Sequence, residues 1–175
     1  DDLLRPYYLE SLYSAVMDSD ADMAVGAHSK FFSINNRLEQ FTIDIDSEIA
    51  VAMDAKNAIL KLTKVNIILP PWNKIYKASI IKENNLRFEL GVKIGEDAIF
   101  NMAYYCLCKK ISLVKDCGYI YMILDTTSAI SKYNSEFGYN SIRYLNGYKK
   151  VLETHNLSQE DNDKLMTIMS FSVMN

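Results

Sequence analysis

Short apolar runs typical of β-strands alternate along this chain with stretches that have the apolar periodicity of a helix. The expected strands, the third of them a short strand or an extended turn, are residues 23–27, 41–45, 86–88, 111–114 and 119–124. The expected helices are residues 6–17, 47–64, 78–84, 96–110, 136–155 and 158–175. This order, without any internal repeat, predicts a mixed α/β fold in which a sheet is flanked by helices.

Several residues are typical of the ends of these elements. Pro6 suits the first turn of a helix, because its missing N–H would have no partner there. Ser47 is the expected N-cap of the second helix. Ser158, with Asp161 three residues later, resembles a capping box at the start of the last helix. The polar residues 115–118 predict a turn that joins the last two strands.

Size and composition favour a globular protein. The chain has 175 residues, and 49% of them are apolar, which is enough for a substantial core. The 22 acids and 19 bases give a formal net charge of −3 without a long run of one sign, so nucleic acid is not an expected partner. Cys106, Cys108 and Cys117 lack the spacing of a zinc site, and they predict reduced thiols packed in the core.

The sequence has no apolar stretch long enough for a membrane span and no visible signal segment, so we expect a cytoplasmic protein. It begins without methionine and ends inside an apolar-periodic run, from which we expect both ends to continue in a longer protein. The apolar faces of the C-terminal helices are explained equally well by ordinary packing and by peripheral contact with the inner face of a membrane or with a partner.

Three pairs of acidic residues are candidates for a site that holds a divalent cation. Such a cation needs hard oxygen ligands on a rigid support, with coordination positions left open for a substrate. The pair Asp18 and Asp20 follows a helix, and the pair Asp44 and Asp46 precedes one, where acids commonly serve turns and caps. The pair at residues 1–2 has no preceding sequence by which to judge it.

Gly95, Glu96 and Asp97 form the strongest local candidate for catalysis. Glycine permits a tight approach of the backbone, and both acids fall in the first turn of an amphipathic helix. One interpretation is that the acids simply stabilise the positive end of the helix dipole. The other is that the helix holds one carboxylate in position as a general base. The residues by themselves leave both interpretations open.

Trp72, Asn73 and Lys74 combine an aromatic ring, an amide and a cation directly after a Pro-Pro pair. Rings cover the C–H faces of sugars, whereas amides and ammonium groups bind hydroxyls or phosphates, so the three residues are candidates for substrate binding. A lone tryptophan is nevertheless more often part of the core. His28 and His155 have no partner at the spacing of a catalytic triad, and the chain has no phosphate-binding glycine motif.

The order of several short motifs resembles that of the bacterial family 2 glycosyltransferases, above all those that build capsular, cell-wall or lipopolysaccharide glycans. The motifs are Asp-Asp-x-x-x-Pro-x-x-Leu-Glu at 1–10, Trp-Asn-Lys-Ile-Tyr-Lys at 72–77, Asn-Asn-Leu-Arg-Phe at 84–88, Gly-Glu-Asp at 95–97 with Phe-Asn at 100–101, Tyr-x-Tyr at 119–121, and Ser-x-Ile-Ser at 128–131. The resemblance implies the C-terminal, acceptor-side portion of a GT-A fold at 1–131, followed by a helical extension at 132–175. It also implies that the nucleotide-binding half lies upstream, so that this chain by itself is inactive.

The resemblance further implies a metal-dependent, inverting hexosyltransferase and gives each candidate residue a role. Asp1 and Asp2 would belong to the motif that holds Mg²⁺ or Mn²⁺ against the diphosphate of a nucleotide-sugar, with a UDP-sugar as the expected donor. Asp97 would remove the proton from a hydroxyl of a glycan or lipid-linked acceptor, and Glu96 would bind acceptor hydroxyls. Trp72 and Lys74, with the neighbouring amide, would shape the sugar and phosphate side of the cleft.

The sequence departs from the family pattern after the Tyr-x-Tyr motif, where many relatives carry an arginine. Met122 continues the apolar run instead, so the missing cation would have to come from Lys132 or from a residue beyond position 175. One alternative is therefore a non-catalytic carbohydrate-binding or scaffolding module with a degenerate transferase core. Another is an unrelated metal-dependent hydrolase that uses the same carboxylates.

Overall fold

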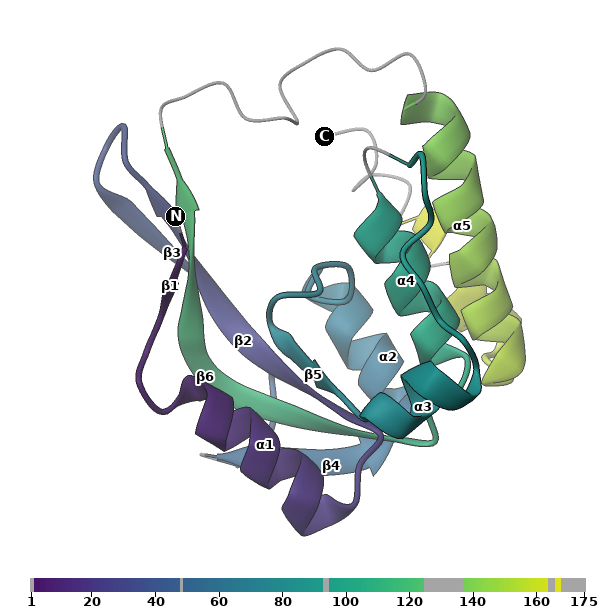
Figure 1. The fold of residues 1–175 in the computed structure, drawn as a ribbon, viewed down its shortest axis with the longest axis horizontal. Coiled ribbons are helices and arrows are strands. Elements are labelled where there is room, and N and C mark those ends of the chain that lie inside the picture. The colour runs from purple at the N-terminus through teal and green to yellow at the C-terminus, as the bar shows by residue number, and fades with distance from the viewer. Residues whose placement is uncertain (1, 48, 93–94, 125–136, 164–165, 168–175) are drawn as a thin grey trace.

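The computed structural model describes residues 2–47, 49–92, 95–124, 137–163 and 166–167, and it confirms a mixed α/β fold (Figure 1). The strands are β1 (Leu3–Leu4), β2 (Met23–Phe32), β3 (Arg37–Phe41), β4 (Ala50–Asp54), β5 (Lys74–Tyr76) and β6 (Lys110–Ile123). The helices are α1 (Tyr8–Ser19), α2 (Ala55–Lys64), α3 (Ala78–Glu83), α4 (Glu96–Tyr105) and α5 (Phe137–Thr154). Residues 159–163 are also helical.

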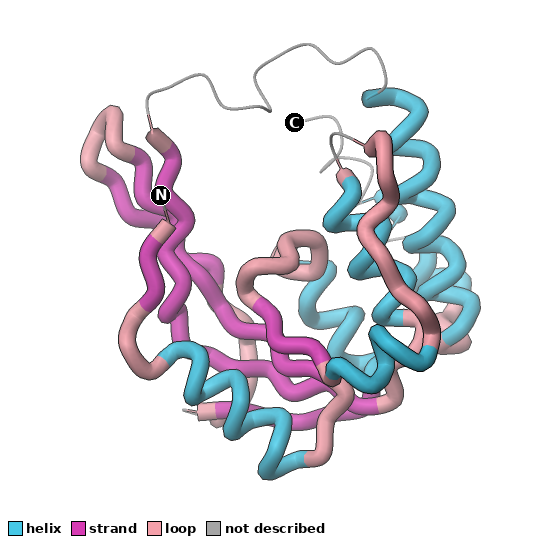
Figure 2. Tube along the Cα trace, in the orientation of Figure 1, coloured by secondary structure: helices cyan, strands magenta, loops and turns pink. Residues whose placement is uncertain are grey.

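The six strands form one mixed sheet (Figure 2). Its main order is β1-β6-β2-β3, while β4 also pairs with β6 and β5 also pairs with β2. The pairing of β2 with β6 is parallel, and the other pairings are antiparallel. The two long strands β2 and β6 are therefore the centre of the sheet, and every other strand is attached to one of them.

The prediction of two separate strands at 111–114 and 119–124 is wrong, because both belong to the single strand β6. The polar residues 115–118 do not reverse the chain but form an irregularity within the strand. Gly26 is paired with Val114 and His28 with Tyr119, so one residue of β2 lies opposite four residues of β6. Such a bulge bends the strand and breaks the regular pairing without reversing the chain, and the local composition resembles a turn for that reason.

The predicted helix at 47–64 begins later than expected, since its first part is the strand β4. Asp54, and not Ser47, is the N-cap of α2, and its Oδ1 accepts a hydrogen bond from the Asn57 N–H at 3.1 Å. Helical and strand patterns coincide over this short apolar run, and pairing with β6 decides between them. Lys61 and Lys64 lie in the last turn of α2 as predicted.

Two other predicted strands are absent from the described residues. At 41–45, Ile43 and Ile45 are buried and Thr42 and Asp44 exposed, as the alternation predicts, but only the first residue of this segment belongs to a strand. Residues 86–88 are irregular. Both segments lack a neighbouring strand with which to form ladder hydrogen bonds, and burial alone does not make a strand.

The helices cover the sheet with two hydrophobic clusters. On one face, α2, α4 and α5 share the larger cluster, in which the Tyr148 hydroxyl of α5 donates to Thr63 Oγ1 of α2 at 3.1 Å. On the other face, α1 contributes Tyr8, Leu12 and Ala15 to a smaller cluster. Figure 1 shows α1 lying against the sheet apart from α2, α4 and α5. Cys108 and Cys117 are buried in the larger cluster, as expected for core thiols.

The C-terminal helix α5 packs in the same core as the segments that precede it. Tyr144, Tyr148, Val151 and Leu152 are buried there together with residues of α2 and α4. The predicted boundary between residues 131 and 132 lies outside the described residues. Within the described ranges, no helix combines the length and the hydrophobicity that crossing a bilayer requires.

We predict that Gly118→Ala destabilises the fold, because Tyr8 already fills the space beside this glycine. An added Cβ at Gly118 would lie 2.4 Å from Cδ2 and 2.6 Å from Cβ of Tyr8. Overpacking of this kind costs about 2 kcal/mol of unfolding free energy, measurable by urea denaturation. In the Tyr8→Ala background the same substitution should cost much less, because the clash is gone. Equal costs in both backgrounds would contradict this explanation.

Candidate active site

Glu96 and Asp97 occupy the first turn of α4, where the sequence predicts them. Gly95 precedes them at φ +88°, a conformation that other residues rarely adopt, and no atom lies within 4 Å of the position its Cβ would take. The Oδ1 atom of Asp97 accepts a hydrogen bond from the Ala98 N–H at 2.7 Å. This bond holds the carboxylate in a fixed position at the start of the helix.

The carboxyl group of Asp97 is more basic than an ordinary aspartate. Partial burial raises its pKa, and the neighbouring charge of Glu96 raises it further. The Ala98 N–H and the ammonium group of Lys74 act in the opposite direction. A carboxylate whose pKa lies above its usual value accepts a proton more readily, which is the property that a general base needs.

Lys74 lies in β5, and its ammonium group is buried inside the protein. Its Nζ donates to the Ile67 carbonyl at 3.0 Å, to Asn73 Oδ1 at 2.8 Å, and to the Pro70 carbonyl. An ammonium group has three donors, so all of them are used within the chain. Burial lowers the pKa of Lys74 well below its ordinary value, and the nearby Asp97 carboxylate partly opposes that effect.

Asn73 is fully buried and connects the same segment to the centre of the sheet. Its Nδ2 donates to the Gly26 carbonyl at 2.8 Å, and its own carbonyl accepts from the Gly26 N–H at 2.9 Å. In this structure the side-chain polar groups of Asn73 and Lys74 form hydrogen bonds with other groups of the same chain. Direct contact of either residue with a substrate therefore stays a prediction.

Trp72 lies on a pair of tyrosines from β6. Its ring stacks on Tyr119, with centroids 4.3 Å apart, and on Tyr121, at 5.4 Å. It meets the His28 ring edge-on at 4.7 Å. Trp72 is neither fully buried nor fully exposed. It can therefore be part of the core and also present a surface to a substrate. One part of the ring is packing surface, and the rest remains accessible.

Asp2 is attached to the same aromatic group. Its Oδ2 accepts a hydrogen bond from the Tyr119 hydroxyl at 2.5 Å, and its Oδ1 accepts one from the Met122 N–H at 2.9 Å. Each carboxylate oxygen has a second lone pair, so both can still bind a cation. Asp2 therefore fits the chemistry of a divalent metal ligand, although further ligands would have to come from elsewhere. Asp1 lies outside the described residues.

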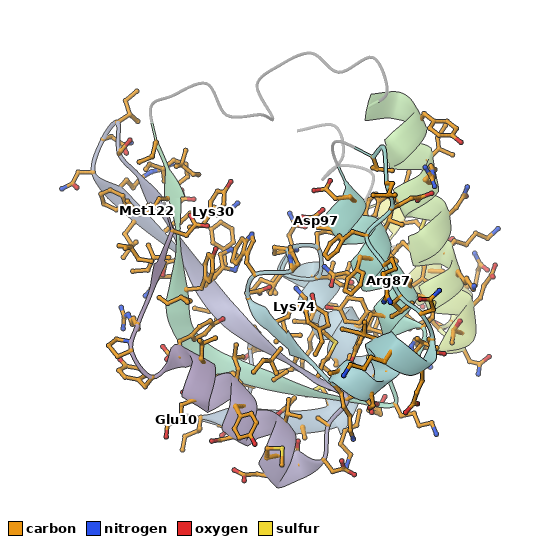
Figure 3. The ribbon with its side chains drawn as sticks, viewed as in Figure 1. Glu10, Lys30, Lys74, Arg87, Asp97 and Met122 are labelled. Carbon is orange, nitrogen blue, oxygen red and sulfur yellow. The ribbon has the colours of Figure 1, made fainter. Side chains whose placement is uncertain are left out.

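The segment from Trp72 to Lys74 connects the two acidic groups. At one end, Trp72 stacks on the tyrosine that holds Asp2. At the other end, Lys74 lies close enough to Asp97 to interact with its charge. Figure 3 shows Asp97 at the upper end of α4 and Lys74 of β5 below it. Residues far apart in the sequence are thus brought to one region.

The other acidic pairs have structural surroundings. Asp20 ends α1 with a left-handed backbone and forms an ion pair with Lys77 at 3.0 Å. Asp18, Asp44 and Asp46 are exposed. Across the part of the chain that the structure describes, no three His, Cys, Asp or Glu side chains are grouped closely enough to hold a metal ion. Lys132 lies outside the described residues.

Two residues near the site make contacts that were not predicted from the sequence. His28 is 2% exposed and stacks on Phe41 at 4.8 Å. Asn101 of α4 accepts a hydrogen bond from the Tyr76 hydroxyl at 2.6 Å and donates to the Leu69 carbonyl at 2.5 Å. Asn101 thereby ties α4 to the loop before Trp72. It belongs to the Phe-Asn motif, but its buried position was visible only in the fold.

We predict a component of stability that depends on His28 and disappears in acid. Burial lowers the pKa of His28 from 6.5 to about 4, so the unfolded chain binds this proton at a higher pH than the folded one. The contribution is fully present above pH 6.5 and is lost as the pH falls towards 4, by about 3 kcal/mol. His28→Phe keeps the aromatic packing and should lack this component in urea unfolding measured at several pH values. An identical pH dependence in both proteins would disprove the assignment.

Comparison with known proteins shows similarity to parts of two bacterial glycosyltransferases, although no family model matches the chain. It is 30% identical over 130 residues to glycosyltransferase GlyA of Streptococcus pneumoniae, which covers 70% of this chain and 18% of that protein. It is 39% identical over 61 residues to the poly(ribitol-phosphate) beta-glucosyltransferase of Bacillus spizizenii, covering 35% of this chain and 10% of that protein. The chain thus spans less than a fifth of either relative.

The fold is also that of a solved glycosyltransferase. Residues 1–349 of TarS from S. aureus, in complex with UDP-GlcNAc, match 95% of this chain with a TM-score of 0.65 at 19% identity, and the match covers 44% of that structure. A second structure of TarS residues 1–349 matches all of this chain with a TM-score of 0.63 at 18% identity, and the match covers 46% of that structure. These similarities confirm the resemblance that the motifs predicted: the chain is a relative of the bacterial glycosyltransferases and has the fold of the C-terminal part of their GT-A domain.

Proposed function

We propose that this chain is part of an inverting family 2 glycosyltransferase, of the hexosyltransferase type, that transfers a sugar from a UDP-sugar to a hydroxyl of a glycan or lipid-linked acceptor. The observation that carries the proposal is the position of Asp97, a partly buried carboxylate of raised pKa that the segment 72–74 connects to Asp2. The similarity to two bacterial glycosyltransferases and to a TarS structure that contains UDP-GlcNAc supports it.

In this proposal Asp97 is the general base. Its carboxylate accepts the proton of an acceptor hydroxyl while the hydroxyl oxygen attacks the anomeric carbon from the side opposite the leaving diphosphate, so that one displacement inverts that carbon. The bond to Ala98 holds the carboxylate in one orientation, and Lys74 favours its charged form before the proton arrives. Glu96, in the same helical turn, binds hydroxyl groups of the acceptor.

Asp1 and Asp2 would hold Mg²⁺ or Mn²⁺ together with phosphate oxygens of the donor. When bound, such a cation supplies positive charge to the diphosphate. The protein's own contribution is the orientation of Asp2, which the Tyr119 hydroxyl and the Met122 N–H fix from two directions. Trp72 presents the accessible part of its ring to the sugar. Lys74, whose donors are occupied, acts by positioning the loop and by its charge.

The remaining parts of the proposal concern the whole protein. The nucleotide-binding half of the GT-A domain would precede residue 1, with residues 1–131 on the acceptor side and 132–175 as a helical extension. The enzyme would act in the cytoplasm, at or near the inner face of the membrane, in the synthesis of a surface polymer such as a cell-wall or capsular glycan. One of the two relatives, named as a poly(ribitol-phosphate) beta-glucosyltransferase, supports a polymeric acceptor.

We predict that Asp97→Asn lowers kcat of the full-length enzyme by about 10³-fold, because the amide cannot accept the proton. Binding of the donor should change little, because Asp97 acts on the acceptor. Glu96→Gln is the matched control in the same helical turn, and it should raise KM for the acceptor more than it lowers kcat. Turnover of Asp97→Asn at the wild-type rate would refute the role of this residue. Release of free sugar without any acceptor would instead indicate a hydrolase.

A second prediction concerns the metal ion. Chelation by EDTA should abolish transfer, and added Mn²⁺ should restore it. Asp2→Asn should raise the Mn²⁺ concentration needed for half-maximal activity by about tenfold, because the neutral amide is a poorer ligand for a hard cation. Tyr119→Phe removes the hydrogen bond to Asp2 but keeps the carboxylate, and its effect should be smaller. Full activity in EDTA, or binding of carbohydrate without any transfer, would overturn the proposal of a metal-dependent enzyme.

A further inference from the structure

One face of the sheet carries a row of aromatic rings with a lysine at its end. In the parallel pair of β2 and β6, His28 lies beside Tyr119, and two residues further on Lys30 lies beside Tyr121. Paired residues of neighbouring strands point to the same face, and so do residues two apart in one strand. Trp72 stacks on both tyrosines. Lys30 therefore shares this face with Trp72.

Among the residues that the structure describes, Lys30 has no carboxylate partner. Its Nζ lies 4.7 Å from the centroid of the Phe41 ring. Glu39 lies opposite Lys30 in β3, but its carboxylate pairs with Arg37 at 2.6 Å. Lys30 is only partly buried. Its three N–H donors are thus available to an anion that approaches this face of the sheet.

Asp2 is attached to the same row of rings from the other side. The Tyr119 hydroxyl donates to its carboxylate, and Asp2 directly precedes β1, which pairs with β6 along the edge opposite to β2. The carboxylate and the ammonium group therefore flank β6. Two strand spacings, about 10 Å, separate the backbones of β1 and β2. A diphosphate that binds a cation at Asp2 and extends across Tyr121 would approach Lys30.

The position of Lys30 relative to Asp97 fits the same arrangement. Figure 3 shows Lys30 and Met122 on the part of the sheet that lies opposite Asp97. In an inverting displacement the base and the leaving group lie on opposite sides of the reacting carbon. A cation that binds the leaving diphosphate stabilises the charge that develops on this group, while the base acts on the acceptor. Met122 and Ile123, which follow the tyrosines in β6, carry no charge to this face.

We propose that Lys30 binds the diphosphate of the nucleotide-sugar donor and stabilises the charge that this group gains as it leaves. The inference rests on the proposed function and assigns the residue that recognises the donor's phosphates within this chain. The acceptor oxygen forms a bond to the anomeric carbon and gives its proton to Asp97. The bond between that carbon and the diphosphate oxygen breaks, and its electron pair stays on the diphosphate. The Lys30 ammonium group donates a hydrogen bond to that group as its charge grows.

The test compares Lys30→Met, Lys30→Arg and a control, Lys64→Met, in the full-length enzyme. Lys64 is an exposed lysine in the last turn of α2, remote from the row of rings. Calorimetric titrations in the presence of Mn²⁺ use UDP and UMP as probes. Lys30→Met should weaken the binding of UDP about 10- to 100-fold, whereas the binding of UMP, which lacks the second phosphate, should change less than threefold. Lys30→Arg should retain most of the affinity for UDP, and Lys64→Met should behave as the wild type.

Kinetic measurements separate this role from a merely structural one. With a UDP-sugar that the wild type uses, Lys30→Met should lower kcat about 100-fold, and Lys30→Arg should restore it to within tenfold. Equal weakening of UDP and UMP, or an unchanged kcat in Lys30→Met, would overturn the assignment of Lys30 while the enzyme remained a transferase. A wild type that binds no UDP and transfers no sugar would refute the proposed function itself. Thermal unfolding of each variant identifies any loss of affinity that comes from a damaged fold.

Discussion

The parallel pairing of β2 with β6 is the interaction on which the rest of this structure depends. Each of the other four strands pairs with one of these two. The pairing also sets the register that places His28 beside Tyr119 and Lys30 beside Tyr121. Parallel strands need a long connection, and here all of the chain between β2 and β6 forms it. That connection contains the segment 72–74 and the helix α4, so the pairing brings both parts of the candidate site together.

The segment 72–74 is rigid because its polar groups are satisfied inside the protein. A buried ammonium group is costly unless every donor has a partner, and Lys74 finds three acceptors in residues 67–73. Asn73 joins the same segment to Gly26 in the sheet by two hydrogen bonds. Polar residues that resemble a ligand-binding motif thus act in this structure as the support for the neighbouring tryptophan. These bonds hold the backbone next to Trp72 in a fixed position on the sheet.

Elements with a strong local signal were predictable from the sequence, and those that depend on partners were not. The helix at 96–105 has its apolar face, its acidic first turn and its preceding glycine within a few residues, so local information is sufficient. The strand β4 and the continuity of β6 depend on which strands lie beside them. A bulge of four residues against one has the polar composition of a turn, and only the neighbouring strand distinguishes the two.

The sequence by itself determined the fold class, the start of α4 and the identity of the acidic residues that the site would use. It also determined the resemblance to the glycosyltransferases, because the order of motifs survives when single motifs are weak. Only the tertiary structure decided which side chains are free to act. The ammonium group of Lys74 donates its hydrogen bonds to carbonyl groups of its own loop. Lys30, by contrast, lies opposite Glu39, whose carboxylate pairs with Arg37 instead. The two side chains are chemically identical, but they differ in burial and in the acceptors around them. Contacts between distant segments set both properties, and these decide whether a lysine supports the fold or is available to a ligand.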